Sequence, residues 1–366
     1  MLPSYRRLAG ELNVTMASIQ GAMADLEREG LIRRERGRGV FPRTRRRPAR
    51  TKRLPLQCIN LVVKSFDFAP SFVEGDYLAG YTKVLDDFPS PVRMRFVAGE
   101  ELNSDYDGLL SKAVPVEAQG AVLVNWSSAE ITEWFQRNAV PFVVQYHSQY
   151  ASENLPPHFG VYVNKAGGAS QAVNHLLELG HRDIGFLGPV DLDPDGGLDP
   201  NVLWEGTPFE GYRSALVCSG LHGVKDYIAD CWTKEGRESF GIAKAYLQRS
   251  RRPTAVLAGC DEIARSLLKA ARALNIRVPE DLSVVGFNNQ PDSDKTAPPL
   301  TTISIPRREL AGSAVALLME AVKQPRVPPR TRILETHLII RETTAPPPAE
   351  RAGNSGKLSS RAVLSE

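Results

Sequence analysis

The chain has 366 residues, of which 42% are hydrophobic, so it is long and apolar enough for two or three domains with proper cores. No apolar run approaches the ~18 residues of a membrane span and no apolar signal core follows Met1, which predicts a cytoplasmic protein. The four cysteines lie far apart without metal-ligand spacing, so we expect reduced thiols, no metal and no cofactor.

The net charge of +3 is divided unevenly along the chain. Residues 1–53 hold 14 Lys and Arg against 5 Asp and Glu, a net of +9, whereas the remaining residues hold 31 against 37, a net of −6. A basic segment joined to an acidic remainder points to a polyanionic partner for the basic segment alone.

The first 43 residues predict two helices joined by a tight turn, followed by a two-stranded wing. Ser4 can cap the first helix and Thr15 the second. The apolar residues with helical spacing are Leu8 and Leu12 in the first helix and Ile19, Met23 and Leu26 in the second. The β-prone pairs at 31–32 and 40–41 flank RRERGRG, whose glycines suit a hairpin tip. This order places one helix in the DNA major groove and the wing on flanking phosphates.

These segments resemble the winged helix-turn-helix of GntR-type regulators, because LPSYRRLA, LEREGLI and GRGVF follow that family's order and spacing. The resemblance implies a set of DNA-binding residues. Arg6 would contact a phosphate, the start of the recognition helix would present Thr15, Ser18 and Gln20, and the wing tip would consist of Arg36, Gly37 and Arg38. Long polar side chains at such positions contact base edges, and hydroxyls and backbone amides contact phosphates.

The sequence departs from the GntR pattern in two ways. The family commonly has Arg where this chain has Met16 and Gln20, so the family's operator sequence does not transfer. The family also has a further helix before LPS, whereas Met1 stands directly before it here. We expect the true start codon to lie upstream; the alternative is an impaired DNA-binding head. A pair of surface helices with solvated arginines is a third interpretation of the same residues.

Two segments predict no domain of their own. Residues 44–55 form a basic, proline-punctuated linker whose arginines either follow DNA phosphates or are simply solvated. Residues 345–366 are rich in Pro, Ser and Ala without periodicity and predict a disordered tail.

Residues 56–344 alternate between apolar strand candidates and helical segments. The strand candidates are residues 56–63, 92–97, 119–126, 140–146, 183–188, 253–259 and 281–287. The helical segments are residues 77–88, 166–179, 209–219, 236–249, 261–274 and 307–322. Such alternation predicts an α/β body of parallel, doubly wound sheets, and its length favours two lobes. Ligands of such folds bind outside the carboxyl ends of the strands.

Four segments of the body resemble the effector-binding domain of LacI/GalR-type regulators: HLLELGHRDIGFLGP, FEGYRSAL, PTAVLAGCDEIARSLLKAARALNIRVPEDLSVVGFNN and PPLTTISIP. The resemblance implies a periplasmic-binding-protein-like fold that dimerises and binds a small molecule, commonly a sugar, between its lobes. A GntR-type head on such a body is similar to the arrangement of arabinose-type repressors. His181, at a turn into a buried strand, is interpreted as structural and not catalytic.

The resemblance also places the candidate effector-binding residues. At three family pocket positions the chain departs from the usual Arg, Asn and Asp, which are here Pro208, Cys260 and Asn288. Asp261 lies beside this set, although a carboxylate at the start of a helix can equally be a cap. The candidate aromatic walls are Phe68, Phe72, Trp126 and Tyr146, each of which can instead be core. We therefore expect the effector to be a small molecule, a class that includes sugars, and we name no particular sugar.

The acidic stretch at residues 190–206 faintly resembles a calcium loop, but it lacks the closing Glu and flanking helices, so a solvated loop is the better interpretation. No nucleophile–base motif or phosphate loop indicates an enzyme. The sequence predicts a dimeric transcriptional regulator, most simply a repressor, that binds operator DNA and a small effector. The alternatives are a cytosolic binding protein with an impaired head and a regulator whose body only dimerises.

Overall fold

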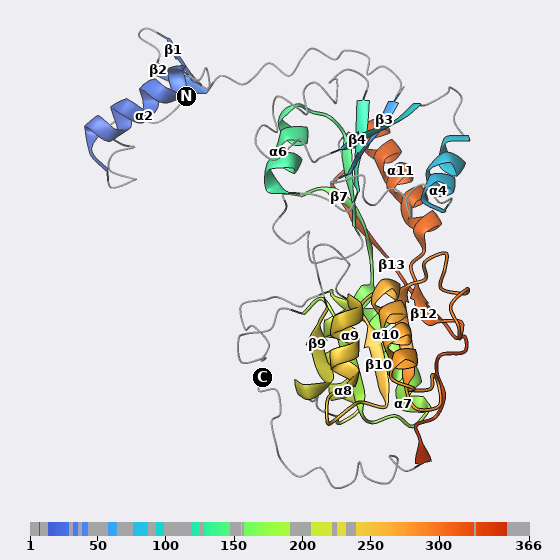
Figure 1. Ribbon diagram of the computed structural model, residues 1–366. Helices are drawn as coiled ribbons and strands as arrows, with labels where there is room; N and C mark the ends of the chain where they lie inside the picture. The colour runs from blue at the N-terminus through green and yellow to red at the C-terminus, as the bar shows by residue number, and fades with distance from the viewer. Residues whose placement is uncertain are drawn as a thin grey trace. The chain divides into compact units, whose positions relative to one another are not determined.

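The computed structural model describes residues 7, 14–28, 32–35, 39–42, 58–63, 76–86, 93–98, 119–124, 128–146, 155, 157–190, 206–221, 225–231, 239–325 and 327–349. The chain divides into two compact units, Met1–Pro55 and Leu56–Glu366 (Figure 1).

In the first unit a helix packs against a two-stranded hairpin. Helix α2 (Met16–Arg28) is followed by the antiparallel strands β1 (Ile32–Glu35) and β2 (Gly39–Pro42). Ile19, Met23 and Ile32 form its buried core, with Leu26 and Val40 packed against them. The predicted second helix and wing are confirmed. Arg7 is helical, and the rest of the predicted first helix lies outside the described residues.

The second unit contains two six-stranded sheets. We call the sheet β13-β7-β6-β5-β3-β4 and its helices the first lobe, and the sheet β14-β12-β11-β10-β8-β9 and its helices the second lobe. Every strand pair is parallel except β12 with β14. The predicted α/β class with parallel sheets is confirmed.

The first lobe consists of β3 (Cys58–Val63), α4 (Asp76–Asp86), β4 (Arg93–Ala98), β5 (Gln119–Val124), α6 (Ala129–Arg137), β6 (Phe142–Tyr146), β7 (Phe159–Val163), α11 (Arg307–Lys323) and β13 (Thr331–Leu334). Alternate strand residues face opposite sides, as the pleat requires. Val122 and Val143 pack with α4 and α11, whereas Leu123 and Val144 pack with α6. Helices therefore cover both faces of this sheet.

The second lobe consists of α7 (Lys165–Glu178), β8 (Ile184–Gly188), α8 (Pro208–Cys218), a 3₁₀ turn (Lys225–Tyr227), β9 (Ile228–Asp230), α9 (Ser239–Leu247), β10 (Ala255–Ala258), α10 (Asp261–Ala273), β11 (Ser283–Asn288), β12 (Thr301–Ser304) and β14 (His337–Ile339). Leu257 packs on the side of α7 and α8, and Val256 on the side of α9 and α10. This sheet is doubly wound as well.

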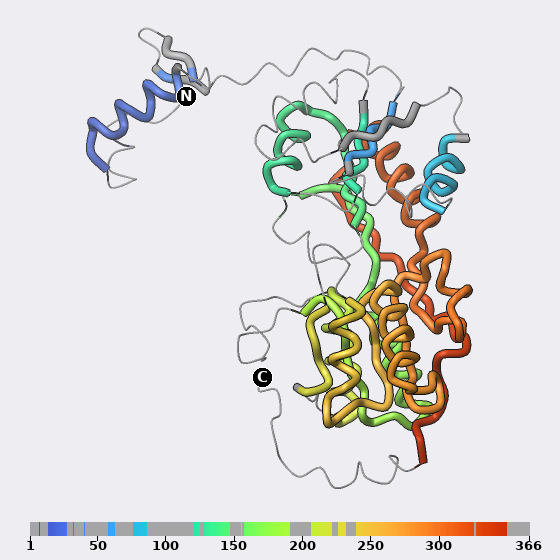
Figure 2. Tube along the Cα trace, viewed as in Figure 1, coloured from blue at the N-terminus to red at the C-terminus, as the bar shows by residue number. Residues whose placement is uncertain are grey.

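The chain crosses between the lobes three times, from β7 to α7, from β12 to α11 and from β13 to β14 (Figure 2). Each lobe is therefore built from segments far apart in the sequence. The middle crossing carries α11 back to the first lobe, where Gly80 of α4 lies so close to the Arg308 carbonyl that a Cβ there would overlap it. The crossings fix the carboxyl ends of both sheets at the junction.

All seven strand candidates and all six helical segments of the body overlap an observed element. The sequence patterns did not predict six of the observed elements: helix α6 and the strands β7, β9, β12, β13 and β14. Strand β9 has three residues and β13 is mostly exposed, so neither presents a long apolar alternation. Tertiary pairing stabilises both of them.

His181 is 1% exposed, and its ring is held on both sides. Nδ1 lies 2.8 Å from Thr254 Oγ1, and Nε2 lies 2.8 Å from the carbonyl oxygen of Ala345. These contacts agree with the structural role that the sequence predicts for His181. They also correct the boundary of the predicted tail, because Ala345 is bonded to the second lobe, while residues 350–366 lie outside the described part of the chain.

Candidate functional site

The start of helix α2 presents polar side chains to solvent. Thr15, Ser18 and Gln20 are all exposed. The Ser18 amide donates to Thr15 Oγ1 at 3.2 Å, and the two hydroxyls lie 2.8 Å apart, so Thr15 caps the helix as predicted. Gln20 has both its amide donor and its acceptor available for a base edge. Arg6, Arg36, Gly37 and Arg38 lie outside the described residues.

Two large apolar side chains accompany these polar ones. Val14 and Met16 are 44% and 42% exposed, respectively, whereas Ile19 and Met23 further along the helix are buried. Exposed apolar groups at the start of a recognition helix can contact the methyl group of thymine. The chain therefore combines an amide and an apolar side chain where the GntR pattern commonly has two arginines.

In the second lobe the parallel strands end together at what we call the carboxyl edge, formed by the residues that end β8, β9, β10, β11 and β12. Extending the β10–β11 register brings Cys260 opposite Asn288, and Asn288 pairs directly with Ser304 of β12. Cys260, Asn288 and Ser304 thus form one row across three strands. Burial raises the pKa of the Cys260 thiol, so Cys260 is a neutral group there.

Asn288 and Asn289 adopt left-handed backbone conformations, with φ of 101° and 48°. Asparagine tolerates this region better than most residues. Arg307, the first residue of α11, holds the turn: its Nη2 donates to the Asn288 carbonyl at 2.6 Å and its Nη1 donates to the Asn289 carbonyl at 3.2 Å. The backbone carbonyls are therefore engaged, whereas no partner of the Asn288 side-chain amide is found among the described residues.

Asp261 begins α10, as predicted, but it is completely buried. Its carboxylate accepts hydrogen bonds from Thr302 Oγ1 at 2.6 Å, from the Gln290 amide at 2.6 Å and from Ser293 Oγ at 2.7 Å. Burial raises its pKa, and these three donors lower it. Asp261 thus ties β12 and the 290–293 turn to α10 instead of capping its own helix.

Lys165, which the sequence analysis did not single out, is the first residue of α7. It is half-buried, and burial lowers its pKa to about 8, with the neighbouring Cys260 acting weakly in the opposite direction. Within the described part of the chain its ammonium makes no hydrogen bond or ion pair. A lysine directly after a fully buried strand, as in VYVNK, is the signal that could have revealed it.

The first and third crossings are bonded to each other through Asn164. Its Oδ1 accepts from the Gly167 amide at 2.8 Å, which caps α7, and its Nδ2 donates to Glu335 Oε2 at 3.0 Å. Thr336 Oγ1 donates to the Asn164 carbonyl at 3.3 Å. These bonds join the first and third crossings, and we call this joined pair the hinge.

The remaining predicted effector residues that the structure describes lie apart from Cys260, Asp261 and Asn288. Tyr146 is half-buried at the end of β6 in the first lobe, next to Gln145, which is buried and accepts from Tyr81 Oη at 2.8 Å. Pro208 is the first residue of α8 and lies behind the Thr207 cap. Phe68, Phe72, Trp126 and most of the acidic stretch at residues 190–206 lie outside the described residues.

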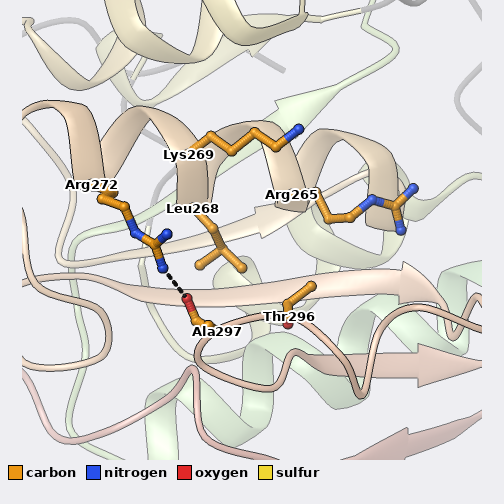
Figure 3. A pocket seen from close by; sticks show the side chains of 6 residues that line it. All are labelled: Arg265, Leu268, Lys269, Arg272, Thr296 and Ala297. Carbon is orange, nitrogen blue, oxygen red and sulfur yellow. Dashed lines mark hydrogen bonds between the residues drawn. The ribbon is translucent and has the colours of Figure 1, made fainter.

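A hollow of about 180 Å³ lies elsewhere, on the outer side of α10 (Figure 3). It is lined by Arg265, Leu268, Lys269, Arg272, Thr296 and Ala297. Arg272 Nη2 reaches down to the Ala297 carbonyl at 3.1 Å, and the Arg265 guanidinium lies at the other end. Arg265 Nη1 is buried without a hydrogen-bond partner in the part of the chain that the structure describes, whereas its Nη2 donates to Gln290 Oε1 at 3.0 Å. This hollow is cationic and part of the surface.

Among the described residues, no group of three or more His, Cys, Asp or Glu side chains could hold a metal ion. In the same residues, no helix combines the length and apolar character needed to cross a membrane.

Two families match the chain. The one described as bacterial regulatory proteins, gntR family, matches residues 1–41, and the periplasmic binding protein-like domain matches residues 173–344. Both agree with the resemblances seen in the sequence.

Three relatives extend these matches. The HTH-type transcriptional regulator reg1 of Streptomyces lividans is 30% identical over 83% of this chain and 86% of its own length. The arabinose metabolism transcriptional repressor of Halalkalibacterium halodurans is 26% identical over 95% of this chain and 92% of its own. The HTH-type transcriptional repressor CytR of Escherichia coli K12 is 33% identical, but the match spans only 57% of either chain.

The fold is also found among solved structures. The transcriptional regulator CelR in complex with cellobiose aligns with 93% of this chain and all of its own at a TM-score of 0.66 and 18% identity. At that identity the likeness concerns the fold alone.

Proposed function

Because the chain belongs to the family of HTH-type transcriptional regulators that join a GntR-type head to a periplasmic-binding-protein-like body, we propose that it is a cytoplasmic repressor controlled by a small effector. The head binds operator DNA, and the effector binds between the lobes at the carboxyl edge. The protein has no catalytic activity in this proposal. Repression relieved by the effector is the simplest form of the switch.

The observation that carries the DNA-binding proposal is the exposed, capped start of α2 beside the β1–β2 wing. Gln20 stands at that start with no competing structural task, since Ile19 and Met23 supply the core contacts. A bidentate amide contact to a base is worth about 1–3 kcal/mol of discrimination. The basic segment before residue 54 adds affinity without sequence preference.

The effector proposal rests on the hinge. A ligand that bonds to both lobes favours one arrangement of the three crossings, and it shifts the population only by its differential affinity for the two arrangements. The hydrogen bonds of Asn164 and Arg307 cross this junction, so a change there reaches both lobes.

DNA binding is tested with the full chain on a pool of random duplexes at several salt concentrations. Replacing Gln20 by Ala should change which sequences are enriched, and replacing Arg38 by Ala should weaken binding to all of them. The matched control is Gln248→Ala, an exposed glutamine of the body. Absence of salt-sensitive DNA binding by the unmodified chain would refute the regulator proposal and favour a cytosolic binding protein.

For the homodimer we propose the cationic hollow on α10 as the contact surface. Arg265 Nη2 donates to Gln290 Oε1 and Arg272 Nη2 to the Ala297 carbonyl, so this basic side of α10 lies beside the turn of residues 290–297. The turn carries Asp294 and also Asp292, which pairs with Lys295. A two-fold related copy can place each basic helix against the other copy's acidic turn, and the buried, unpartnered Arg265 Nη1 then gains an acceptor. Sedimentation should give a dimer for the unmodified chain and for Lys83→Glu, and a monomer for Arg272→Glu.

A further inference from the structure

The charged groups at the carboxyl edge differ in how many hydrogen bonds they make among the described residues. Asp261 accepts three bonds, and Glu335 accepts from Asn164 Nδ2. Lys165 has no partner among the described residues, and Arg307 uses Nη1 and Nη2 for one backbone carbonyl each. Among the groups that the structure describes, the donors with capacity to spare are therefore the cations Lys165 and Arg307, together with the Asn288 amide.

Packing fixes where Lys165 lies. A Cβ on Gly211 of α8 would overlap the Ala166 carbonyl, and Ser170 Oγ donates to the Gly211 carbonyl at 3.0 Å. On its other side, a Cβ on Gly168 would overlap Thr336 and come within 2.9 Å of Ile303 Cγ2. The first turn of α7 is thus held between α8 and the end of β12, which brings Lys165 to the carboxyl edge.

Arg307 is fixed at the same edge from the other lobe. Its backbone begins α11, which packs on the first lobe, while its guanidinium reaches the Asn288 and Asn289 carbonyls of the second lobe. A guanidinium has five N–H donors, so further donors remain for a ligand. Lys165 and Arg307 therefore enter from two different crossings and flank the row of Cys260, Asn288 and Ser304.

We infer that the effector is an anion, a small molecule with a carboxylate or phosphate group that binds to Lys165 and Arg307 while its hydroxyls bond to Asn288. This inference rests on the proposed effector function and names the chemical class of the ligand. Lys165 and Arg307 carry only hydrogen-bond donors, which match the acceptor oxygens of an anion, and the described carboxylates at or beside this edge, Asp230, Asp261 and Glu335, already accept hydrogen bonds.

The electrostatics support this choice. A half-buried ammonium without a partner is unfavourable, and its lowered pKa expresses that penalty. An anion beside it stabilises the charged form and supplies an acceptor. A neutral sugar could accept a hydrogen bond from the ammonium but would leave its charge unbalanced.

The inference is tested by isothermal titration of the full chain with three matched probes: glucose, gluconate and glucose 6-phosphate. We expect at least one of the two anions to bind at least tenfold more tightly than glucose. Lys165→Gln and Arg307→Gln should each lower that affinity at least tenfold, and Lys165→Arg should retain most of it. Lys83→Gln, which removes an exposed cation from α4, is the control and should have no effect.

The remaining outcomes would contradict different parts of the inference. Preference for glucose, unchanged in Lys165→Gln, would overturn the anionic class and leave the proposed effector function intact. Anion binding that Lys165→Gln and Arg307→Gln do not weaken would overturn the site. Binding of none of the three probes would overturn the inference, whereas the proposed regulator is judged separately by its salt-sensitive DNA binding. Melting curves of each variant show whether it has folded.

Discussion

Asp261 and Lys165 both lie at the carboxyl edge of the second lobe, each at the start of a helix, and they differ in how far their bonds are satisfied. Asp261 is completely buried and accepts three hydrogen bonds, one from β12 and two from the 290–293 turn. Lys165 is half-buried, and its ammonium has no partner in the described part of the chain. A saturated polar group holds the edge together, whereas an unsatisfied one marks the place where a ligand adds something the protein lacks.

The largest effect on stability is expected from removing the carboxylate of Asp261. Asp261→Ala leaves the Gln290 amide, Thr302 and Ser293 without their acceptor, and each buried donor left unsatisfied costs about 1–3 kcal/mol. We expect a loss of about 3–5 kcal/mol in the free energy of unfolding, measured by urea denaturation. Asp261→Asn keeps one acceptor oxygen and should lose less.

Gly286→Ala provides an independent control for the same network. A Cβ at Gly286 would overlap Asp261 Oδ1, so this variant displaces the carboxylate without removing it. It should destabilise the protein in the same direction as Asp261→Ala. Full stability of both variants would show that the three hydrogen bonds contribute nothing and that the contrast with Lys165 is wrong.

An intermediate effect is expected at the hinge. Asn164→Ala removes the cap of α7 and the bond to Glu335, for which about 1–2 kcal/mol is typical of a lost cap. Glu335→Ala leaves the cap in place and removes the crossing bond alone, so it should destabilise less. Equal losses in the two variants, measured by thermal unfolding, would mean that the cap has no role.

The sequence was sufficient for the parts of the molecule that local patterns determine. The periodicity of Ile19 and Met23 predicted α2, and the apolar runs at residues 183–188 and 253–259 predicted β8 and β10. Thr15 was recognised as a cap because a hydroxyl three residues before an amide is a local arrangement. No knowledge of distant contacts was needed there.

The candidate site could be predicted only in part, because its groups come from different crossings. Cys260, Asp261 and Asn288 were found by resemblance to known pocket positions, but the sequence does not say that Asp261 is saturated by Thr302, 41 residues away. Arg307 and Lys165 are charged residues at helix starts, which resemble ordinary solvated positions until the packing of α7 and α11 is known. The state of a polar group depends on its tertiary neighbours, and a single sequence does not contain them.

The smallest effect on the free energy of unfolding is expected from replacing Lys165, and this replacement should stabilise the protein. Since burial lowers the Lys165 pKa to about 8, below the ~10.4 of an unfolded chain, the unfolded state binds more protons between these two values. The contribution of Lys165 to stability therefore rises as the pH increases from about 8 to about 10. Below pH 8 both states are charged, and the full penalty of holding the ammonium unpaired is present.

Lys165→Met removes this penalty and keeps the length of the side chain. Because Lys165 is only half-buried, solvent screening reduces the gain to about 1 kcal/mol, or about 2–4 °C in melting temperature at pH 7. The difference between variant and unmodified protein should shrink as the pH is raised toward 10. Burial raises the pKa of Cys260 above this window, so this neighbour does not titrate there. If the variant is less stable than the unmodified protein at pH 7, the Lys165 ammonium is already stabilised within the protein. The electrostatic argument that an anion binds at the carboxyl edge would then be wrong.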